Sequence, residues 1–218
     1  MWSTGNENYY SSSASYANGM FYDQIWYFKN NDSTRPIHSE SSDGNNGTDM
    51  RSNMYPSVDT LYSRAAANMP YVLCEYDHAM GNAVGNLKEY WDAIRSSDNM
   101  LGGFIWDWAD QSLATTREDG KTFWAYGGDW TDASSNADAF CANGVLFADH
   151  TPSAKAVQMR YDHQQVNFYL ENEDAKVTDG TIKVKVVNEL ENSTLENYNI
   201  IWSLKKDDEE IATKTISL

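Results

Sequence analysis

The sequence predicts an α/β fold, namely part of a (β/α)8 TIM barrel (about its last five strands) followed by part of an antiparallel β-sandwich. Two observations support this. Short apolar segments alternate with amphipathic ones up to about residue 112, which is typical of parallel βα units. From about residue 176, apolar and polar residues alternate with period two. We expect barrel residues at 1–155, a connector at 156–175 and a truncated immunoglobulin-like sandwich at 176–218.

The first half of the chain predicts alternating helices and strands. A helix is expected from about Ser11 to Asn30, because Phe21, Ile25 and Phe28 follow one another at i, i+4 and i+7. The same periodicity predicts two further helices, over 58–69 and 86–97. The stretch MWSTGNEN reads as the end of a strand followed by a loop. Further strands are expected within the stretches RPIHSES, MRSNMYPS, PYVLCEY and MLGGFIWDWADQ.

The second half predicts antiparallel strands. The stretch TTREDGKTFWAYGGDW reads as a hairpin with Asp119-Gly120 as its turn. An irregular region and the connector follow. In the last segment, two alternating stretches are followed by the turn KKDDEE, and about three strands fit before the last residue. We expect both ends of the chain to be truncated, because neither the barrel nor the sandwich has enough strands.

Composition excludes several partners. The formal net charge is -16, so binding to nucleic acid or to an anionic membrane surface is disfavoured. Two isolated cysteines, Cys74 and Cys141, predict reduced thiols rather than a disulfide framework. We find no signal peptide and no apolar run long enough to span a bilayer, and we expect a cytoplasmic location.

Two acids stand at predicted strand ends. Glu7 follows WSTGN, and Glu75 follows the apolar run YVLC. In a barrel the carboxyl ends of the strands meet at one rim, so these acids can face each other. Hydrolysis of a glycosidic bond needs such a pair. The alternatives are a surface loop acid for Glu7 and a hydrogen-bonded structural acid for Glu75.

Six stretches carry a resemblance to a known family. WSTGNEN, LCEYDHAMGN, GGFIWDWADQSL, AYGGDW and the FCANG and FADHTP segments together resemble the β-galactosidases of glycoside hydrolase family 2. The resemblance runs from residue 2 to about residue 168. It implies the second half of that family's catalytic barrel and the start of the next β-sandwich. It also implies an enzyme that cleaves terminal β-D-galactosides with retention, in which the two carboxyl groups lie about 5–5.5 Å apart.

The resemblance implies roles for the residues around the two acids. Glu7 resembles the general acid/base, and Glu75 resembles the nucleophile. Asn6 resembles the residue that binds the sugar beside the nucleophile, and Tyr55 resembles a tyrosine next to the nucleophile.

Further roles concern the sugar and two metal ions. His78 resembles a ligand of a sugar hydroxyl, and Trp106 resembles the aromatic wall of the sugar site. The carbonyl of Phe140 and the side chain of Asn143 resemble part of a Na⁺ site. Glu7 would also be one ligand of Mg²⁺. The resemblance places the remaining ligands on earlier segments, so both ligand sets are incomplete in this chain.

Each of these residues also has a structural interpretation. His78 could be a hydrogen-bonded core histidine, and Tyr55 could cap a strand. Asn143 could be a turn asparagine. Trp106 and Trp108, two apart on the expected strand, could both be core residues.

Two alternative functions stay open. The chain could be an inactive fragment that needs a missing N-terminal portion, a partner chain or homo-oligomerisation, because missing strands leave unpaired sheet edges. It could instead be a related family 2 glycosidase for another sugar. β-Glucuronidases need basic groups near the sugar carboxylate, and the sequence shows no such motif.

Overall fold

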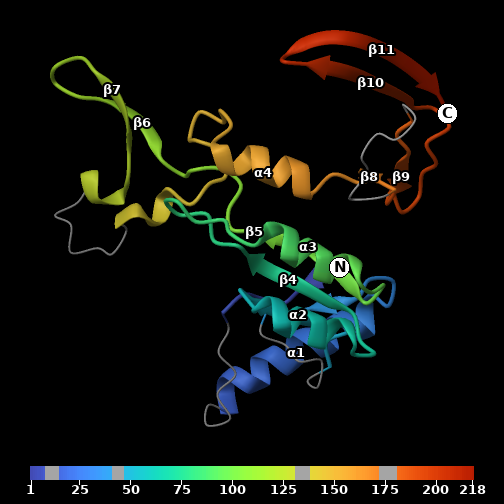
Figure 1. Cartoon of the computed structure of the whole chain (residues 1–218). Coiled ribbons are helices and arrows are strands. Elements are labelled where there is room, and N and C mark those ends of the chain that lie inside the picture. The colour runs from blue at the N-terminus through green and yellow to red at the C-terminus, as the bar shows by residue number, and fades with distance from the viewer. Residues whose placement is uncertain (8–14, 41–46, 131–137, 172–180) are drawn as a thin grey trace. The chain divides into compact units, whose positions relative to one another are not determined.

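The chain divides into two compact units, Met1–Asp162 and His163–Leu218. The fold is given by a computed structural model (Figure 1). It describes residues 1–7, 15–40, 47–130, 138–171 and 181–218.

Parallel strands form the centre of the first unit. One pair consists of β1 (Trp2–Ser3) and β2 (Ile37–His38). The second sheet has the order β3 (Arg51–Met54), β4 (Tyr71–Tyr76) and β5 (Met100–Ile105). The prediction of parallel βα units is therefore confirmed. The described parallel strands form two separate sheets, and no closed barrel forms among the described residues.

The helix α1 (Ser15–Asn31) joins β1 to β2. Phe21 and Ile25 are buried with Ile37, and Phe28 packs against them. The predicted apolar face is therefore confirmed. The expected start of this helix, residues 11–14, lies outside the described residues.

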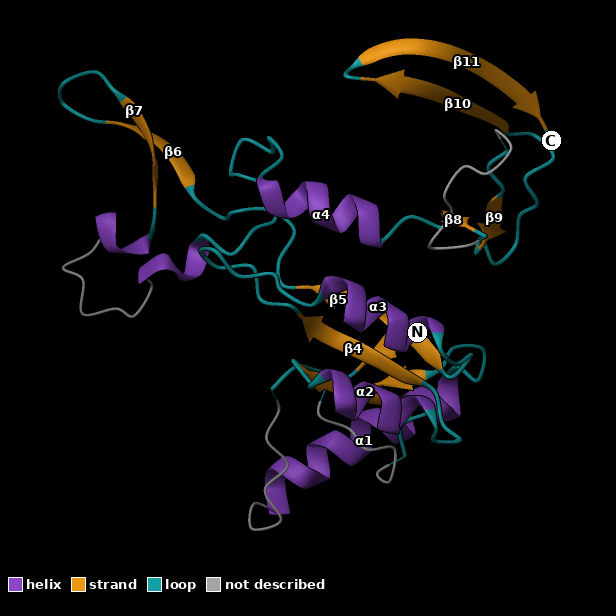
Figure 2. Ribbon diagram, in the orientation of Figure 1, coloured by secondary structure: helices purple, strands orange, loops and turns teal. Residues whose placement is uncertain are grey.

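The main core lies around β4, flanked by the helices α2 (Val58–Ala65) and α3 (Leu87–Arg95) (Figure 2). The side chain of Ser57 accepts the amide of Thr60 and caps α2. The helix α2 is shorter than predicted, because it ends at Ala65 with Ala66 as its C-cap. The core cluster consists of Leu61, Ala65, Tyr71, Leu73, Tyr76, Ala79, Leu87, Ala93, Ile94, Met100, Val145 and Met159. Among the described residues, no helix combines the length and apolar character needed to cross a bilayer.

The predicted hairpin is confirmed as β6 (Leu113–Thr116) paired antiparallel with β7 (Thr122–Ala125). Gly120 takes a φ of 80° in its turn, where a side chain would be strained. Two short 3₁₀ helices follow, η1 (Gly127–Asp129) and η2 (Asp138–Cys141).

The segment predicted as a connector contains regular structure. The helix α4 (Ala154–Asp162) covers its first part, and β8 (Val166–Leu170) covers much of the rest. Ala156 and Met159, three residues apart, are buried on one side of α4. Their burial explains why this stretch is helical rather than irregular.

The second unit contains antiparallel strands. The strand β8 pairs with β9 (Val184–Asn188). A hairpin follows, with β10 (Asn199–Lys206) and β11 (Glu209–Ser217). The predicted turn is confirmed, since Asp207 and Asp208 have φ of 50° and 66°. Positive φ at both central residues is typical of a two-residue hairpin loop.

We expect Gly103→Ala to lower the free energy of unfolding by about 1–3 kcal/mol, measured by urea denaturation. A Cβ at Gly103 would lie 2.9 Å from Leu73 Cβ and 3.0 Å from Tyr76 Cδ1, both on the adjacent β4. The matched control is Gly85→Ala, whose Cβ would meet nothing within 4 Å. Equal stability of the two variants would contradict this packing.

Candidate active site

The carboxyl ends of β1, β4 and β5 border a cavity of about 410 Å³. Three of the predicted site residues, Asn6, Glu75 and Trp106, line it. The other lining residues are Met1, Ser3, Gly5, His38, Cys74, Phe104, Ile105 and Asp107. The structure therefore brings these predicted residues together from segments that are far apart in sequence.

The carboxylate of Glu75 receives a donor on each oxygen. The hydroxyl of Tyr55 donates to Oε2 at 2.7 Å, and the amide of Asn6 donates to Oε1 at 3.4 Å. The backbone also joins these strands, because the Tyr55 amide donates to the Glu75 carbonyl at 3.0 Å. A short bond on one oxygen and a long one on the other hold the group in one orientation and leave Oε1 only weakly engaged. Orientation alone fits a structural acid as well, but Glu75 also lines the cavity.

Tyr55 acts here as a donor. Partial burial, followed by the hydrogen bond to Glu75, raises the pKa of the Tyr55 hydroxyl far above its usual range. The phenol therefore keeps its proton at neutral pH and can stabilise the ionised form of Glu75. A role limited to ending a strand would not place the hydroxyl on the carboxylate.

Three other predicted residues, His78, Phe140 and Asn143, are linked to Tyr55 by a series of contacts. The rings of Tyr55 and His78 lie 5.7 Å apart, and those of His78 and Phe140 lie 6.4 Å apart at 90°. The side-chain amide of Asn143 donates to the carbonyl of Phe140. His78 is only partly buried, so it is not a core histidine. These contacts connect the predicted sugar and sodium ligands to Glu75.

Glu7 is exposed, and its amide donates to Oε2 of Glu40 at 2.8 Å. Sequence reasoning missed Glu40, which is 5% exposed and follows the buried residues Ile37 and His38. The signal was present, because Glu40 is an acid at the end of a short buried strand, as Glu75 is. The loop after Glu7 lies outside the described residues.

Three non-glycine residues at the ends of strands have left-handed backbone. The φ angles of Glu7, Tyr55 and Asp77 are 52°, 45° and 51°. Such conformations are costly for residues with side chains and persist where surrounding contacts enforce them. Two of the three adjoin Glu75, since Tyr55 bonds to it and Asp77 follows it by two residues, and this supports a functional site there.

One structural interpretation is wrong. Trp108 is 57% exposed, so it is not a core residue. The strand β5 ends at Ile105, and neither Trp106 nor Trp108 lies on it. Trp106 is partly buried and lines the cavity, and its role as the aromatic wall of a sugar site stays a prediction.

A polar chain crosses the strands next to the cavity. The two ring nitrogens of His38 lie 3.0 Å from Ser3 Oγ and 2.8 Å from Ser52 Oγ. Burial lowers the pKa of His38, so the neutral ring can donate on one side and accept on the other. Burial also raises the pKa of the Cys74 thiol. Cys74 and Cys141 are both free thiols, as predicted.

Three buried side-chain oxygens lack a hydrogen-bond partner among the described residues, namely Asp77 Oδ2, Asp107 Oδ1 and Asn143 Oδ1. The Asn143 side chain is 2% exposed, so an unpaired oxygen there is costly. Within the described ranges, no group of three or more His, Cys, Asp or Glu side chains could hold a metal ion.

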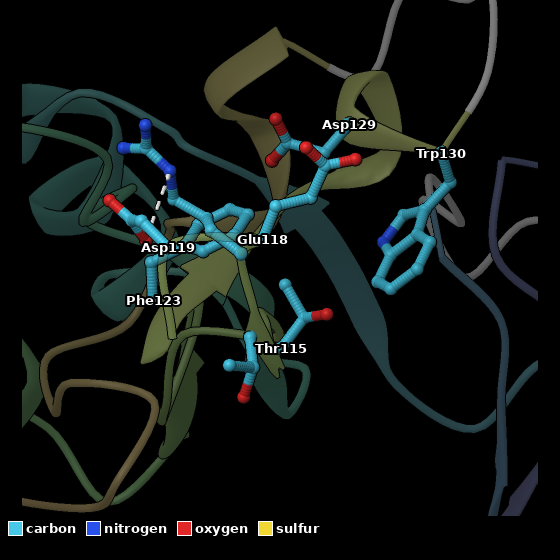
Figure 3. Close-up of a pocket in the computed structure, with 8 residues that line it drawn as sticks. Thr115, Glu118, Asp119, Phe123, Asp129 and Trp130 are labelled. Carbon is cyan, nitrogen blue, oxygen red and sulfur yellow. Dashed lines mark ion pairs between the residues drawn. The ribbon is translucent and has the colours of Figure 1, made fainter. Parts of the chain in front are cut away.

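A larger hollow, of about 580 Å³, lies against the β6–β7 hairpin (Figure 3). Thr115, Phe123 and Trp130 line it together with acids, of which Asp119 forms an ion pair with Arg117 at 3.9 Å. None of the predicted site residues lines this hollow. We therefore place the candidate active site at the smaller cavity, where Glu75 and its donors converge.

Comparison with known proteins identifies relatives. Residues 1–168 match the family described as glycosyl hydrolases family 2, TIM barrel domain. A β-galactosidase from Priestia megaterium is 36% identical over 214 residues, which cover 96% of this chain and 19% of that protein. A β-galactosidase from Photobacterium profundum is 35% identical over 233 residues, which cover 100% of this chain and 22% of that protein. The chain thus spans about a fifth of the length of these curated relatives.

Solved structures of family 2 proteins are also similar. A β-galacturonidase from Eisenbergiella tayi bound to galacturonate matches with a TM-score of 0.47 and 17% identity, covering 74% of this chain and 32% of that chain. A family 2 member from Bacteroides cellulosilyticus matches with a TM-score of 0.49 and 13% identity, covering 100% of this chain and 33% of that chain. At TM-scores this low, the family assignment rests on the sequence match.

We expect Asp77→Asn to raise stability at pH 7 and to leave it nearly unchanged near pH 4. Burial raises the pKa of Asp77 to about 6, so the folded chain retains a proton that the unfolded chain releases. The contribution of this proton to stability is complete at low pH and is lost as pH rises through about 6. The difference is on the order of 2 kcal/mol at pH 7, measured by denaturation across pH.

The control for this experiment is Asp32→Asn, which should have the opposite sign. Hydrogen bonds from Thr34 lower the pKa of Asp32 to about 2, so its contribution is present at neutral pH and is lost as pH falls toward that value. A pH-independent effect of Asp77→Asn would contradict the role of burial at that site.

Proposed function

The chain belongs to the glycosyl hydrolases of family 2, and we propose that it carries the catalytic pair of a retaining hydrolase of terminal β-D-galactosides. The observation that carries this proposal is Glu75, held by Tyr55 and Asn6 at the edge of a cavity. Because the chain spans only about a fifth of its curated relatives, the activity of the whole protein is part of the proposal.

In the first step Glu75 attacks the anomeric carbon. Its ionised carboxylate forms a covalent glycosyl–enzyme bond while the bond to the leaving oxygen breaks. Oε1 is the oxygen that we expect to attack, because Oε2 is held by the shorter bond from Tyr55. Glu7 donates its proton to the leaving oxygen, so that an alcohol departs.

In the second step Glu7, now ionised, takes a proton from water. The resulting nucleophile attacks the anomeric carbon, releases the sugar and restores the carboxylate of Glu75. Two displacements at the same carbon retain the configuration. Trp106 provides an apolar surface in the cavity against which the sugar ring can lie.

Two observations support a neutral galactoside over a sugar acid. The residues that line the cavity, among those described, include no Lys or Arg to pair with a sugar carboxylate. The curated relatives reported above are named β-galactosidases. Together they favour galactose over a glucuronide.

Sodium binding is proposed at Asn143 and Phe140. The buried, unpaired Oδ1 of Asn143 lies in the same residue whose amide bonds the Phe140 carbonyl, and both oxygens suit a hard cation. The Asn143 side chain and the Phe140 carbonyl would hold the ion, which would supply positive charge to this part of the site. The described residues do not assemble a magnesium site around Glu7, so no step is assigned to that metal.

Two further expectations stay predictions, namely the cytoplasmic location and homo-oligomerisation. The inactive fragment that needs an N-terminal portion or a partner chain stays the alternative function.

We expect Glu75→Gln to abolish hydrolysis of nitrophenyl β-galactoside, with a loss of at least about 10³-fold in kcat/KM. The amide cannot serve as the nucleophile, although it keeps the size of the side chain and can still accept from Tyr55. Nitrophenyl release by the purified protein, followed spectroscopically, measures the effect.

Two controls accompany that assay. Glu191→Gln changes a surface acid of the second unit and should leave turnover unchanged. Nitrophenyl β-glucuronide tests the sugar, and we expect no turnover with it. Near-normal activity of Glu75→Gln would overturn the assignment of the nucleophile, and turnover of the glucuronide alone would overturn the choice of sugar.

A further inference from the structure

A buried carboxylate lies next to the proposed acid/base. Past the ends of β1 and β2, the parallel pairing continues, because the Thr4 amide donates to the His38 carbonyl at 2.9 Å and the Glu40 amide donates to the Gly5 carbonyl at 3.1 Å. The next contact uses a side chain, since the Glu7 amide donates to Glu40 Oε2 at 2.8 Å. Glu40 therefore extends the pairing of the two strands by one bond.

The two partners of this bond have different surroundings. Glu40 is 5% exposed, whereas Glu7 is exposed. The backbone of Glu7 has a φ of 52°, a conformation that needs support from neighbouring contacts. A hydrogen bond to an oxygen that is held in a buried position is directional, and it provides that support.

The strand that precedes Glu40, β2, is fixed by its neighbours on both sides. His38, two residues earlier, contacts Ser3 of β1 through Nδ1 and Ser52 of β3 through Nε2. The Ile37 amide donates to Asp49 Oδ2 at 2.8 Å. Because this segment is held by its neighbours, the position of the Glu40 carboxylate is defined by the sheet rather than by an exposed loop.

We propose that Glu40 is a positioning residue for Glu7, acting by accepting its backbone amide. The inference rests on the proposed function, in which the Glu7 carboxyl group protonates the leaving oxygen. Protonation requires the acid within hydrogen-bond reach of that oxygen, and a displacement of about 1 Å can lower the rate by about 10². Glu40 does not touch the substrate in this role, and it fixes the backbone from which the Glu7 side chain extends.

We expect a substitution of Glu40 to slow hydrolysis most for substrates whose leaving oxygen must be protonated. Phenyl β-galactoside has a basic leaving oxygen and depends on protonation. Dinitrophenyl β-galactoside has a leaving group that departs without it. A displaced Glu7 therefore slows the first substrate much more than the second, whereas general damage to the site slows both alike.

Two variants separate the effect of the length of the Glu40 side chain from the effect of its charge. Glu40→Asp keeps the charge but is one methylene shorter, so it cannot reach the Glu7 amide. We expect it to lower kcat/KM for phenyl β-galactoside by about 10- to 100-fold and to change the dinitrophenyl substrate by less than about 3-fold. Glu40→Gln loses the charge but keeps an acceptor at the same reach, and we expect it to restore most of the phenyl activity.

The control for stability is Leu61→Ala, which opens a cavity in the core at α2. It should lower the unfolding midpoint without altering the ratio of the two substrates. Equal losses on both substrates in Glu40→Asp, or a Glu40→Gln variant that behaves like Glu40→Asp, would overturn the proposal.

A second measurement does not depend on turnover. Hydrogen exchange at the Glu7 amide, followed by NMR, should be slow in the parent and in Glu40→Gln and fast in Glu40→Asp. If the parent hydrolyses neither galactoside, the proposed function fails, and the exchange rates alone decide whether Glu40 holds Glu7. Equal exchange in all three proteins would overturn the inference.

Discussion

The double link between Tyr55 and Glu75 is the interaction on which the rest of the site depends. One bond joins the Tyr55 amide to the Glu75 carbonyl, and the other joins its hydroxyl to the Glu75 carboxylate. The first bond continues the pairing of β3 with β4. The second bond fixes the orientation of the Glu75 carboxylate relative to these paired strands. The ring of the same tyrosine contacts His78. Tyr55 therefore orients the Glu75 carboxylate and also packs against the neighbouring His78 ring.

The apolar core makes this link possible. Tyr71, Leu73 and Tyr76 of β4 are each fully buried, in one cluster with residues of α2 and α3. A strand fixed in this way holds the backbone of Glu75, a partly buried residue that lines the cavity. The energetic support of the site is therefore mostly hydrophobic, whereas its orientation is set by a few directed hydrogen bonds.

Local signals predicted much of this arrangement from sequence. The acid after an apolar run identified Glu75, and the Asp119-Gly120 turn identified a hairpin, because both depend on neighbours in sequence. The missed features depend on distant contacts. Glu40 became visible through its bond to Glu7, and the exposure of Trp108 depends on where β5 ends.

The central claim is that Glu75 forms a covalent bond to the sugar. The most direct test uses a dinitrophenyl galactoside with fluorine in place of the 2-hydroxyl, which slows hydrolysis of the intermediate. After incubation with the purified protein, peptide mapping by mass spectrometry locates the label. We predict one fluorogalactosyl group on the peptide that contains Glu75, and none in Glu75→Gln. Stoichiometric labelling of a different residue, with Glu75 unmodified, would contradict the account.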